Sequence, residues 1–203
     1  MTGKILLLLV PVLAIIALAP ISATAQGGPV VQINGVAASS GNELQIASSH
    51  HFSIQTILGN INCEKTDLNI FLTNNHHGIV NGDSFEECEL EGTELPVDIR
   101  TNASEGWQFL IGEGDTGVIQ RLLFGEGGTG TEIVFEAQIQ SEEKVSLATC
   151  AFAAAYVPFI YSQGSDLELF VNSEAFGACG KGILEATFKV TPAGEPAGQV
   201  TVE

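Results

Sequence analysis

The sequence predicts an all-β protein. We expect a single disulfide-stabilised β-sandwich with a Greek-key, immunoglobulin-like strand order, and a barrel is the alternative. Three observations lead to this prediction. Apolar and polar residues alternate over short segments, which puts every second side chain on one face of a strand. Turn sequences rich in glycine, Asn and Asp separate these segments. Four widely spaced cysteines follow an apolar N-terminal segment.

Seven segments alternate in this way, and none of the chain beyond residue 25 shows sustained helical spacing. The segments are residues 30–34, 51–57, 68–73, 107–111, 131–140, 166–172 and 186–191. The turns between them include NGDS, GEGDTG, GEGGTG and PAGEPAG, whose residues tolerate the backbone angles of tight turns. Residues 146–157, SLATCAFAAAYV, carry alanines that favour a helix, but their β-branched and aromatic residues favour a buried strand, which we expect.

Residues 1–25 have the features of a secretory signal peptide. Lys4 precedes the apolar run ILLLLVPVLAIIALAP, and the small residues ISATA follow it. We expect cleavage between Ala25 and Gln26. The alternative is an uncleaved anchor helix, which the prolines within and after this short run disfavour. We therefore expect one secreted domain, residues 26–203, extracellular or periplasmic and without a membrane span after cleavage.

The chain is strongly acidic. It has 24 Asp and Glu residues against 7 Lys and Arg, a formal net charge of −17. Residues 1–25 contain one lysine and no acid, so residues 26–203 carry −18. Such a surface repels phosphate backbones and anionic headgroups, which argues against nucleic acid as a partner and makes cations better candidates.

The four cysteines are expected to form two disulfides, because none lies in a C-x-x-C pair and all follow a signal peptide. Three pairings are possible, and we prefer the sequence neighbours, each bridge adding about 3 to 4 kcal/mol in the chain-entropy model. A four-thiolate zinc site is the alternative, but its ligand spacing differs from the spacing found here. The preferred pairs are Cys63 with Cys88 and Cys150 with Cys179.

The stretch FEECELEG places three glutamates, Glu87, Glu89 and Glu91, at alternate positions. If Cys88 faces the interior to reach its partner, the glutamates face solvent. Phe85 shares their parity, so we expect a bulge or the start of a strand near residues 84–86.

A secreted hydrolase is the more specific interpretation of this row of glutamates. Some β-sandwich glucanases carry paired acids at alternate positions of one strand, and Glu87 and Glu89 have that spacing. Such sites also use aromatic platforms for sugar rings, and this chain has one Trp and two Tyr. We therefore expect a solvated strand face and no enzyme.

Metal binding is a further alternative at the histidine pairs and at two glycine-rich turns. Zinc or copper would bind at His50–His51 or His76–His77 with Asp83 or Glu86, and calcium at GEGDTG (residues 112–117) or GEGGTGTE (residues 125–132). The ligands would be imidazole, carboxylate and carbonyl groups. No regular calcium-loop pattern is present, so we expect solvent-exposed turns and no cofactor. The residues concerned are His76, His77, Glu113 and Asp115.

A small-molecule carrier is the second functional class. A barrel-like interior would hold an apolar ligand between aromatic side chains, although filled cores are commoner than hollow ones. The candidate lining residues are Trp107, Phe109, Phe135 and Phe152.

The order of cysteines and strands resembles a known group of proteins. The segment LNIFLTNNHHGIVNGDSFEEC is followed by ELPVDI, by Trp107, and by a late cysteine before GKGILEATFKVTPAGEPAGQVTV. This order is similar to small secreted two-disulfide bacterial β-proteins, among them uncharacterised actinobacterial exported proteins and, more distantly, the PraB-type activator-of-alkane-oxidation family. The resemblance to the PraB-type family implies a surface or biofilm-matrix role without enzymatic chemistry.

These observations together predict a structural, adhesive or binding module. Such a module presents loops and strand edges to a partner and needs no perturbed carboxylate and no cofactor. Self-association through an edge strand is one route, and the negative charge predicts that it depends on salt or cations.

Overall fold

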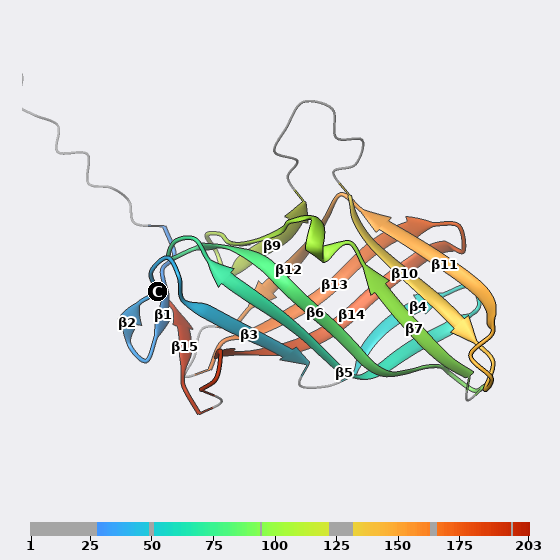
Figure 1. Ribbon diagram of the computed structural model, residues 1–203. Helices are drawn as coiled ribbons and strands as arrows, with labels where there is room; N and C mark the ends of the chain where they lie inside the picture. The colour runs from blue at the N-terminus through green and yellow to red at the C-terminus, as the bar shows by residue number, and fades with distance from the viewer. Residues whose placement is uncertain (1–27, 49–50, 94, 122–131, 163–165, 196) are drawn as a thin grey trace, which may run out of the picture.

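The protein is built from β-strands. The computed structural model describes residues 28–48, 51–93, 95–121, 132–162, 166–195 and 197–203. In this part of the chain fifteen strands are joined by turns and by one short 3-10 turn, η1 (Ala103–Glu105) (Figure 1). The expected signal peptide lies outside the described residues. Among the described residues, no helix is long and apolar enough to cross a membrane.

Two hairpins of long strands run the length of the molecule. β5 pairs with β6, and β13 pairs with β14, in antiparallel registers that extend over most of each strand. Buried and exposed residues alternate along β13, as expected for a strand with one face on the core. The four strands are β5 (Gly59–Leu72), β6 (His77–Leu90), β13 (Glu168–Gly177) and β14 (Gly180–Pro192).

Four further positions in the sheet are each filled by two consecutive shorter strands that lie end to end. β3 and β4 both pair with β5 and β14, β7 and β8 with β6, and β11 and β12 with β13. β9 and β10 fill the fourth position. β9 lies between β8 and β12, and β10 lies between β7 and β11. The strands are β3 (Glu43–Ser48), β4 (Phe52–Thr56), β7 (Leu95–Thr101), β8 (Trp107–Ile111), β9 (Thr116–Arg121), β10 (Ile133–Gln140), β11 (Ser146–Ala154) and β12 (Tyr156–Tyr161).

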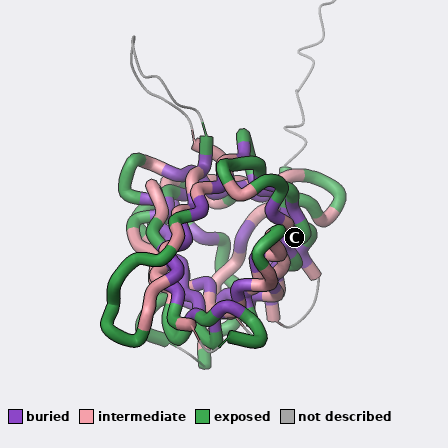
Figure 2. Tube along the Cα trace, turned by 90° about the vertical axis from the view of Figure 1, so that its right-hand side faces the viewer, coloured by how far each residue is buried: buried purple, intermediate pink, exposed green. Residues whose placement is uncertain are grey.

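The sheet closes on itself into an eight-strand barrel. One half is the ring β5-β6-β8-β9-β12-β13-β14-β3, and the other is β5-β6-β7-β10-β11-β13-β14-β4. All neighbours are antiparallel and follow one another along the chain, which is the order of an up-and-down barrel. Seen along its axis, the chain forms a closed ring (Figure 2).

The all-β prediction is confirmed, but the preferred Greek-key sandwich is not the observed arrangement. Sandwich and barrel both bury alternate residues, so the period of the sequence does not distinguish them. What decides is the pairing of β14 with β3 and β4, which joins the last long strand to the first part of the chain. Residues 146–157 form strand rather than helix, as expected.

A three-stranded sheet covers one end of the barrel, which we call the capped end (Figure 1). The Val31 N–H donates to the carbonyl oxygen of Asn75 in the β5–β6 turn at 2.7 Å, and the Leu167 N–H donates to that of Val200 at 2.9 Å. Val31, Leu167 and Val200 are fully buried. The strands, in sheet order, are β15 (Val200–Val202), β1 (Val31–Ile33) and β2 (Val36–Ala37).

The interior is packed with apolar side chains, and its one tryptophan is anchored by a polar residue. Trp107 is buried, and its indole N–H donates to Oδ1 of Asn102 at 2.7 Å. The same oxygen accepts the Val134 N–H at 2.9 Å. Asn102 directly precedes η1, where the chain passes from β7 to β8. Its side chain therefore joins this break in the barrel wall to the neighbouring strand β10.

Candidate functional site

The barrel wall is interrupted where one short strand gives way to the next. β4 pairs with β5 as far as Cys63, and β3 pairs with it from Asp67 onward. β12 pairs with β13 up to Val171, and β11 resumes at Phe176. Between these points the long strands pair with neither of the two short strands among the described residues. Hollows in the outer surface lie at both interruptions, and binding sites in proteins are typically concave surfaces of this kind.

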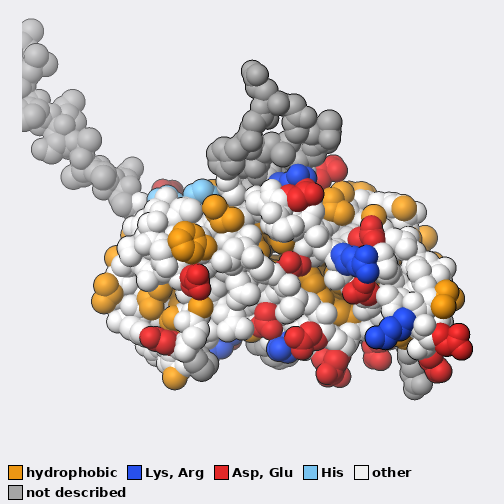
Figure 3. Space-filling model, in the orientation of Figure 1, with side chains coloured by type: hydrophobic (Ala, Val, Ile, Leu, Met, Phe, Trp, Pro, Cys, Tyr) orange, Lys and Arg blue, Asp and Glu red, His pale blue; other side chains and the backbone are white. Residues whose placement is uncertain are grey.

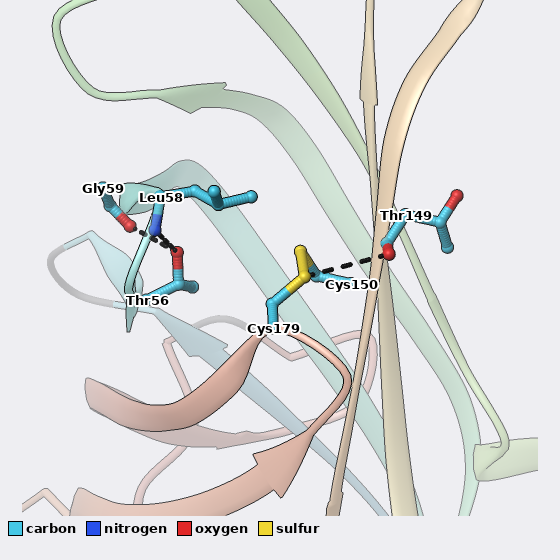
Figure 4. The surroundings of a disulfide bond; sticks show 6 residues. All are labelled: Thr56, Leu58, Gly59, Thr149, Cys150 and Cys179. Carbon is cyan, nitrogen blue, oxygen red and sulfur yellow. Dashed lines mark hydrogen bonds between the residues drawn. A yellow bond between two sulfur atoms is a disulfide. The ribbon is translucent and has the colours of Figure 1, made fainter.

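Both disulfides lie in the half of the barrel that contains β4, β7, β10 and β11, and we call this the disulfide end. Cys63 and Cys88 face each other directly across β5 and β6. Cys150 on β11 joins Cys179 in the turn between β13 and β14. Figure 4 shows Leu58, in the β4–β5 turn, beside this second bridge. The pairing is the one preferred from the sequence, and there is no free cysteine among the described residues.

The row of glutamates faces solvent. Glu87, Glu89 and Glu91 are exposed, whereas Cys88 and Leu90 are buried. The expected orientation of the row is therefore observed.

The irregularity expected near residues 84–86 lies at Glu87, directly after them. Phe85 packs against the core, with its ring 5.2 Å from that of Phe52, and both Glu86 and Glu87 are exposed. The alternation is reset at Glu87, whose φ of 52° lies in the left-handed region. A separate register shift occurs earlier in β6, between Val80 and Gly82, opposite Asn69 and Ile70.

An acidic hollow of about 220 Å³ lies on this outer face, at the break between β3 and β4. The pKa of Glu87 is raised because its carboxyl shares a hydrogen bond with that of Glu64 and because the two negative charges repel. Figure 3 shows acidic side chains gathered over the part of the surface where β5 and β6 run. The residues around the hollow are His51, Asn62, Glu64, Glu87 and Glu89.

Two of the four candidate carrier residues line a cavity inside the barrel. The rings of Trp107 and Phe135 are 5.4 Å apart, and both border this space together with Phe52 and Phe85. The cavity measures about 30 Å³. That is room for about one water molecule, so the space is a packing defect rather than a ligand chamber.

The other two carrier candidates lie elsewhere in the core. Phe109 stacks on Phe159 with ring centroids 5.3 Å apart. Phe152 packs beneath Gly182, where a Cβ would come within 2.9 Å of its ring. The structure thus disperses the four aromatic residues through the core instead of gathering them around one cavity.

The metal-site candidates lie on two adjacent turns at the capped end. The Ile111 N–H donates to the carbonyl oxygen of His76 at 2.9 Å, which brings the β5–β6 and β8–β9 turns together. The imidazole ring of His76 forms a hydrogen bond with the side chain of Asn75, and that of His77 forms one with the hydroxyl of Thr73. Glu113 is exposed to solvent.

The backbone of Asp115 has a structural part in the second turn. Its φ is 61°, and its carbonyl oxygen accepts the Tyr161 N–H at 2.9 Å. Within the described residues, no group of three potential metal ligands gathers at these turns or elsewhere. The second calcium candidate, residues 125–132, lies outside the described residues except for Glu132.

A large surface hollow among the described residues was not predicted from the sequence. It measures about 600 Å³ and lies where β11 passes into β12 and both leave β13. Its rims carry two exposed aromatic side chains, Tyr156 and Phe176. A sequence signal existed: Cys150 and Phe152 are buried at even positions, but Val157 and Phe159 at odd ones, so the alternation slips between them.

Two smaller hollows of about 310 Å³ each continue this one along the outer face of β13, and all three share Asn172. We call the combined surface the β13 valley. Its exposed apolar side chains are Tyr156, Pro158, Ile160, Phe170 and Phe176.

Comparisons with known proteins add nothing to this geometry. Neither family models, nor curated proteins, nor solved structures match the chain.

Proposed function

We propose that the protein is an exported, non-catalytic binding or structural module that acts at the cell surface or in the extracellular matrix. The observation that carries the proposal is the contrast between a filled interior and an apolar outer valley. Tyr156, Ile160 and Phe176 are 56%, 60% and 61% exposed on neighbouring strands. Apolar side chains gathered in this way on a folded surface typically mark an interaction site.

Export fits the covalent framework and the charge. Two disulfides close loops of 25 and 29 residues and persist only in an oxidising compartment. The net charge of −17 keeps separate copies apart and favours solubility outside the cell.

The carrier alternative receives less support. Sites for small molecules usually enclose about 300 Å³ or more. The cavity between Trp107 and Phe135 is about a tenth of that size, so loading it would require the barrel to expand.

A secreted hydrolase is the second candidate, and one observation favours it. Glu87 shares a hydrogen bond with Glu64 that raises its pKa, and the hollow around them also contains Glu89 and His51. A carboxyl whose pKa is raised by a neighbouring carboxyl group is a type of group that serves in general acid catalysis. No aromatic side chain lines this hollow among the described residues, so a platform for sugar rings is missing. Hydrolysis of a polysaccharide panel that disappears in a Glu87→Gln, Glu89→Gln double variant would establish this function.

Fractionation of a culture of the source organism tests the first proposal. We expect the mature protein, beginning at Gln26, in the cell-surface or matrix fraction, from which salt or a chelator releases it. Recovery as a soluble monomer in the medium or periplasm under the same conditions would contradict a surface role.

A further inference from the structure

We propose that the β13 valley binds an extended, basic segment of a partner polypeptide and that its largest hollow receives an arginine or lysine side chain. The inference rests on the proposed function, because it names the partner class for the same outer face. Four features of the valley support it: its length, its charge, its aromatic rims and the break in strand pairing.

The length of the valley suits an extended chain. Phe170 and Phe176 lie on the same face of β13, six residues apart. At about 3.3 Å per residue this separation is about 20 Å. An extended segment of about six residues spans that distance, and its alternate side chains would enter the successive hollows.

The charge of the valley selects a cationic partner. Glu132 and Glu174 line the largest hollow and Glu185 lines an adjoining one, whereas neither a lysine nor an arginine lines any of the three among the described residues. Lys181 forms an ion pair with Glu174 from beside the valley. The net charge of −17 adds a long-range attraction for basic segments.

The aromatic rims explain why a side chain of arginine or lysine fits the hollow. Tyr156 on β12 and Phe176 on β13 both line it, and both side chains are largely exposed. A guanidinium or ammonium group is attracted to such rings, and a guanidinium also stacks on them. With Glu132 at the same hollow, a bound cation would meet both a ring face and a carboxylate.

The interruption of the barrel wall gives the segment access to the backbone. On the side of β11 and β12, residues 172–175 of β13 have no assigned partner strand. Main-chain groups in such a stretch can pair with an extended peptide, as in other complexes that add a strand to a sheet. The β12–β13–β14 face is the far side of the barrel in Figure 1.

Two other occupants are less compatible with these observations. A second copy of residues 26–203 would bring another net charge of −18 to an acidic surface. A neutral polysaccharide would use the aromatic rims but would gain nothing from Glu132 and Glu174. Both occupants are distinguished by the experiment.

The experiment measures binding of a fluorescent ten-residue peptide of alternating Arg and Val to oxidised residues 26–203, by anisotropy at low and at physiological salt. The reference probe is the same peptide with Glu in place of Arg. We expect the basic peptide alone to bind. Tyr156→Ser and Phe176→Ser should each weaken binding about tenfold. Glu132→Gln should weaken it about threefold, and Lys181→Gln should strengthen it about as much, because Glu174 then lacks its internal partner.

Matched controls separate the valley from general attraction to an acidic protein. Ile57→Ser removes an apolar side chain that is 74% exposed at the disulfide end, and Glu143→Gln removes one charge from an exposed turn. Neither should change binding. Equal weakening by the controls, or unchanged binding in the Tyr156 and Phe176 variants, would overturn the proposal.

Two further readouts identify the competing occupants. Binding of neutral oligosaccharides that is lost in Phe176→Ser, without binding of the basic peptide, would replace the polypeptide by a sugar. Dimerisation in sedimentation that is lost in the same variant would replace it by a second copy.

The failures of the two proposals are distinguishable. If the native protein is found at the surface but the basic peptide does not bind, the valley proposal fails alone. If the peptide binds to the valley but the native protein is soluble in the medium, the surface role fails and the site remains.

Discussion

At the disulfide end the barrel is held by two covalent bridges, whereas at the capped end it is closed by a small sheet that packs on its rim. Cys63–Cys88 and Cys150–Cys179 both lie in the half formed with β4, β7, β10 and β11. The capped end instead relies on buried apolar residues of β1 and β15 and their backbone hydrogen bonds. The long strands β5, β6, β13 and β14 connect the two halves. An interrupted barrel wall can thus be stabilised by cross-links at one end and by packing at the other.

Removing a disulfide should lower the free energy of unfolding more than any change at the capped end. Cys63→Ala with Cys88→Ala, or Cys150→Ala with Cys179→Ala, each releases a loop of 25 or 29 residues in the unfolded chain. We expect each pair of substitutions to lower the free energy of unfolding by about 3.5 kcal/mol. Urea denaturation measures it, and a loss below about 1 kcal/mol would show that packing alone holds this end.

Truncating the cap should cost less. Val200→Ala removes two buried methyl groups from the small sheet at the capped end. The expected loss is about 2 kcal/mol. Ala substitution of Val36, which is 68% exposed on β2, is the matched control and should be close to neutral. Equal losses in the two variants would contradict the assignment of the cap to the core.

Asn102 lies at the junction between the two halves of the barrel and should contribute less to stability than either end. Asn102→Ala leaves the indole N–H of Trp107 and the Val134 N–H without their common acceptor. We expect a loss of about 1.5 kcal/mol, because at least one of these donors is buried. Denaturation followed by the fluorescence of the single tryptophan measures it. Asn102→Asp retains the acceptor oxygen but loses the amide donor to the carbonyl oxygen of Glu132, so it should recover only part of the stability.

The smallest expected effect is on the pH dependence of the free energy of unfolding. The folded protein holds a proton at Glu87 more tightly than the unfolded chain does, since Glu64 raises its pKa above the usual 4.5. Stability therefore falls as pH rises through the window that begins near 4.5, and the loss persists above it. Glu87→Gln should flatten this part of the profile, whereas the equal charge change Glu89→Gln should not. Parallel profiles for the wild type and Glu87→Gln would exclude the shared proton.

The sequence was informative about the covalent frame and the faces of strands. The positions of Cys88 and Leu90 between exposed glutamates were read correctly, because a period of two fixes which side chains share a face. The closure of the sheet was predicted only as the alternative, since sandwich and barrel share that period and only the distant pairing of β14 with β3 and β4 separates them.

The candidate sites were harder to predict for a related reason. The β13 valley arises where the alternation slips near Ala155, a local irregularity whose consequence depends on the neighbouring strand β13. The aromatic residues chosen for a carrier were correctly judged apolar, but their sequence positions hold no information on whether they surround a void. Trp107 and Phe135 do meet, around a space that is nearly filled.

The central claim, that binding occurs on the outer face and not inside the barrel, is tested most directly by a residue-resolved NMR titration with a basic apolar peptide and with an apolar dye. The chain has one tryptophan, so the indole N–H of Trp107 is a unique reporter of the interior. We predict that the peptide shifts signals of Tyr156, Asn172 and Phe176 and that both ligands leave the Trp107 indole signal unchanged. A dye-dependent shift of the indole signal, together with shifts at Phe52 and Phe135, would contradict the claim and establish an internal carrier site.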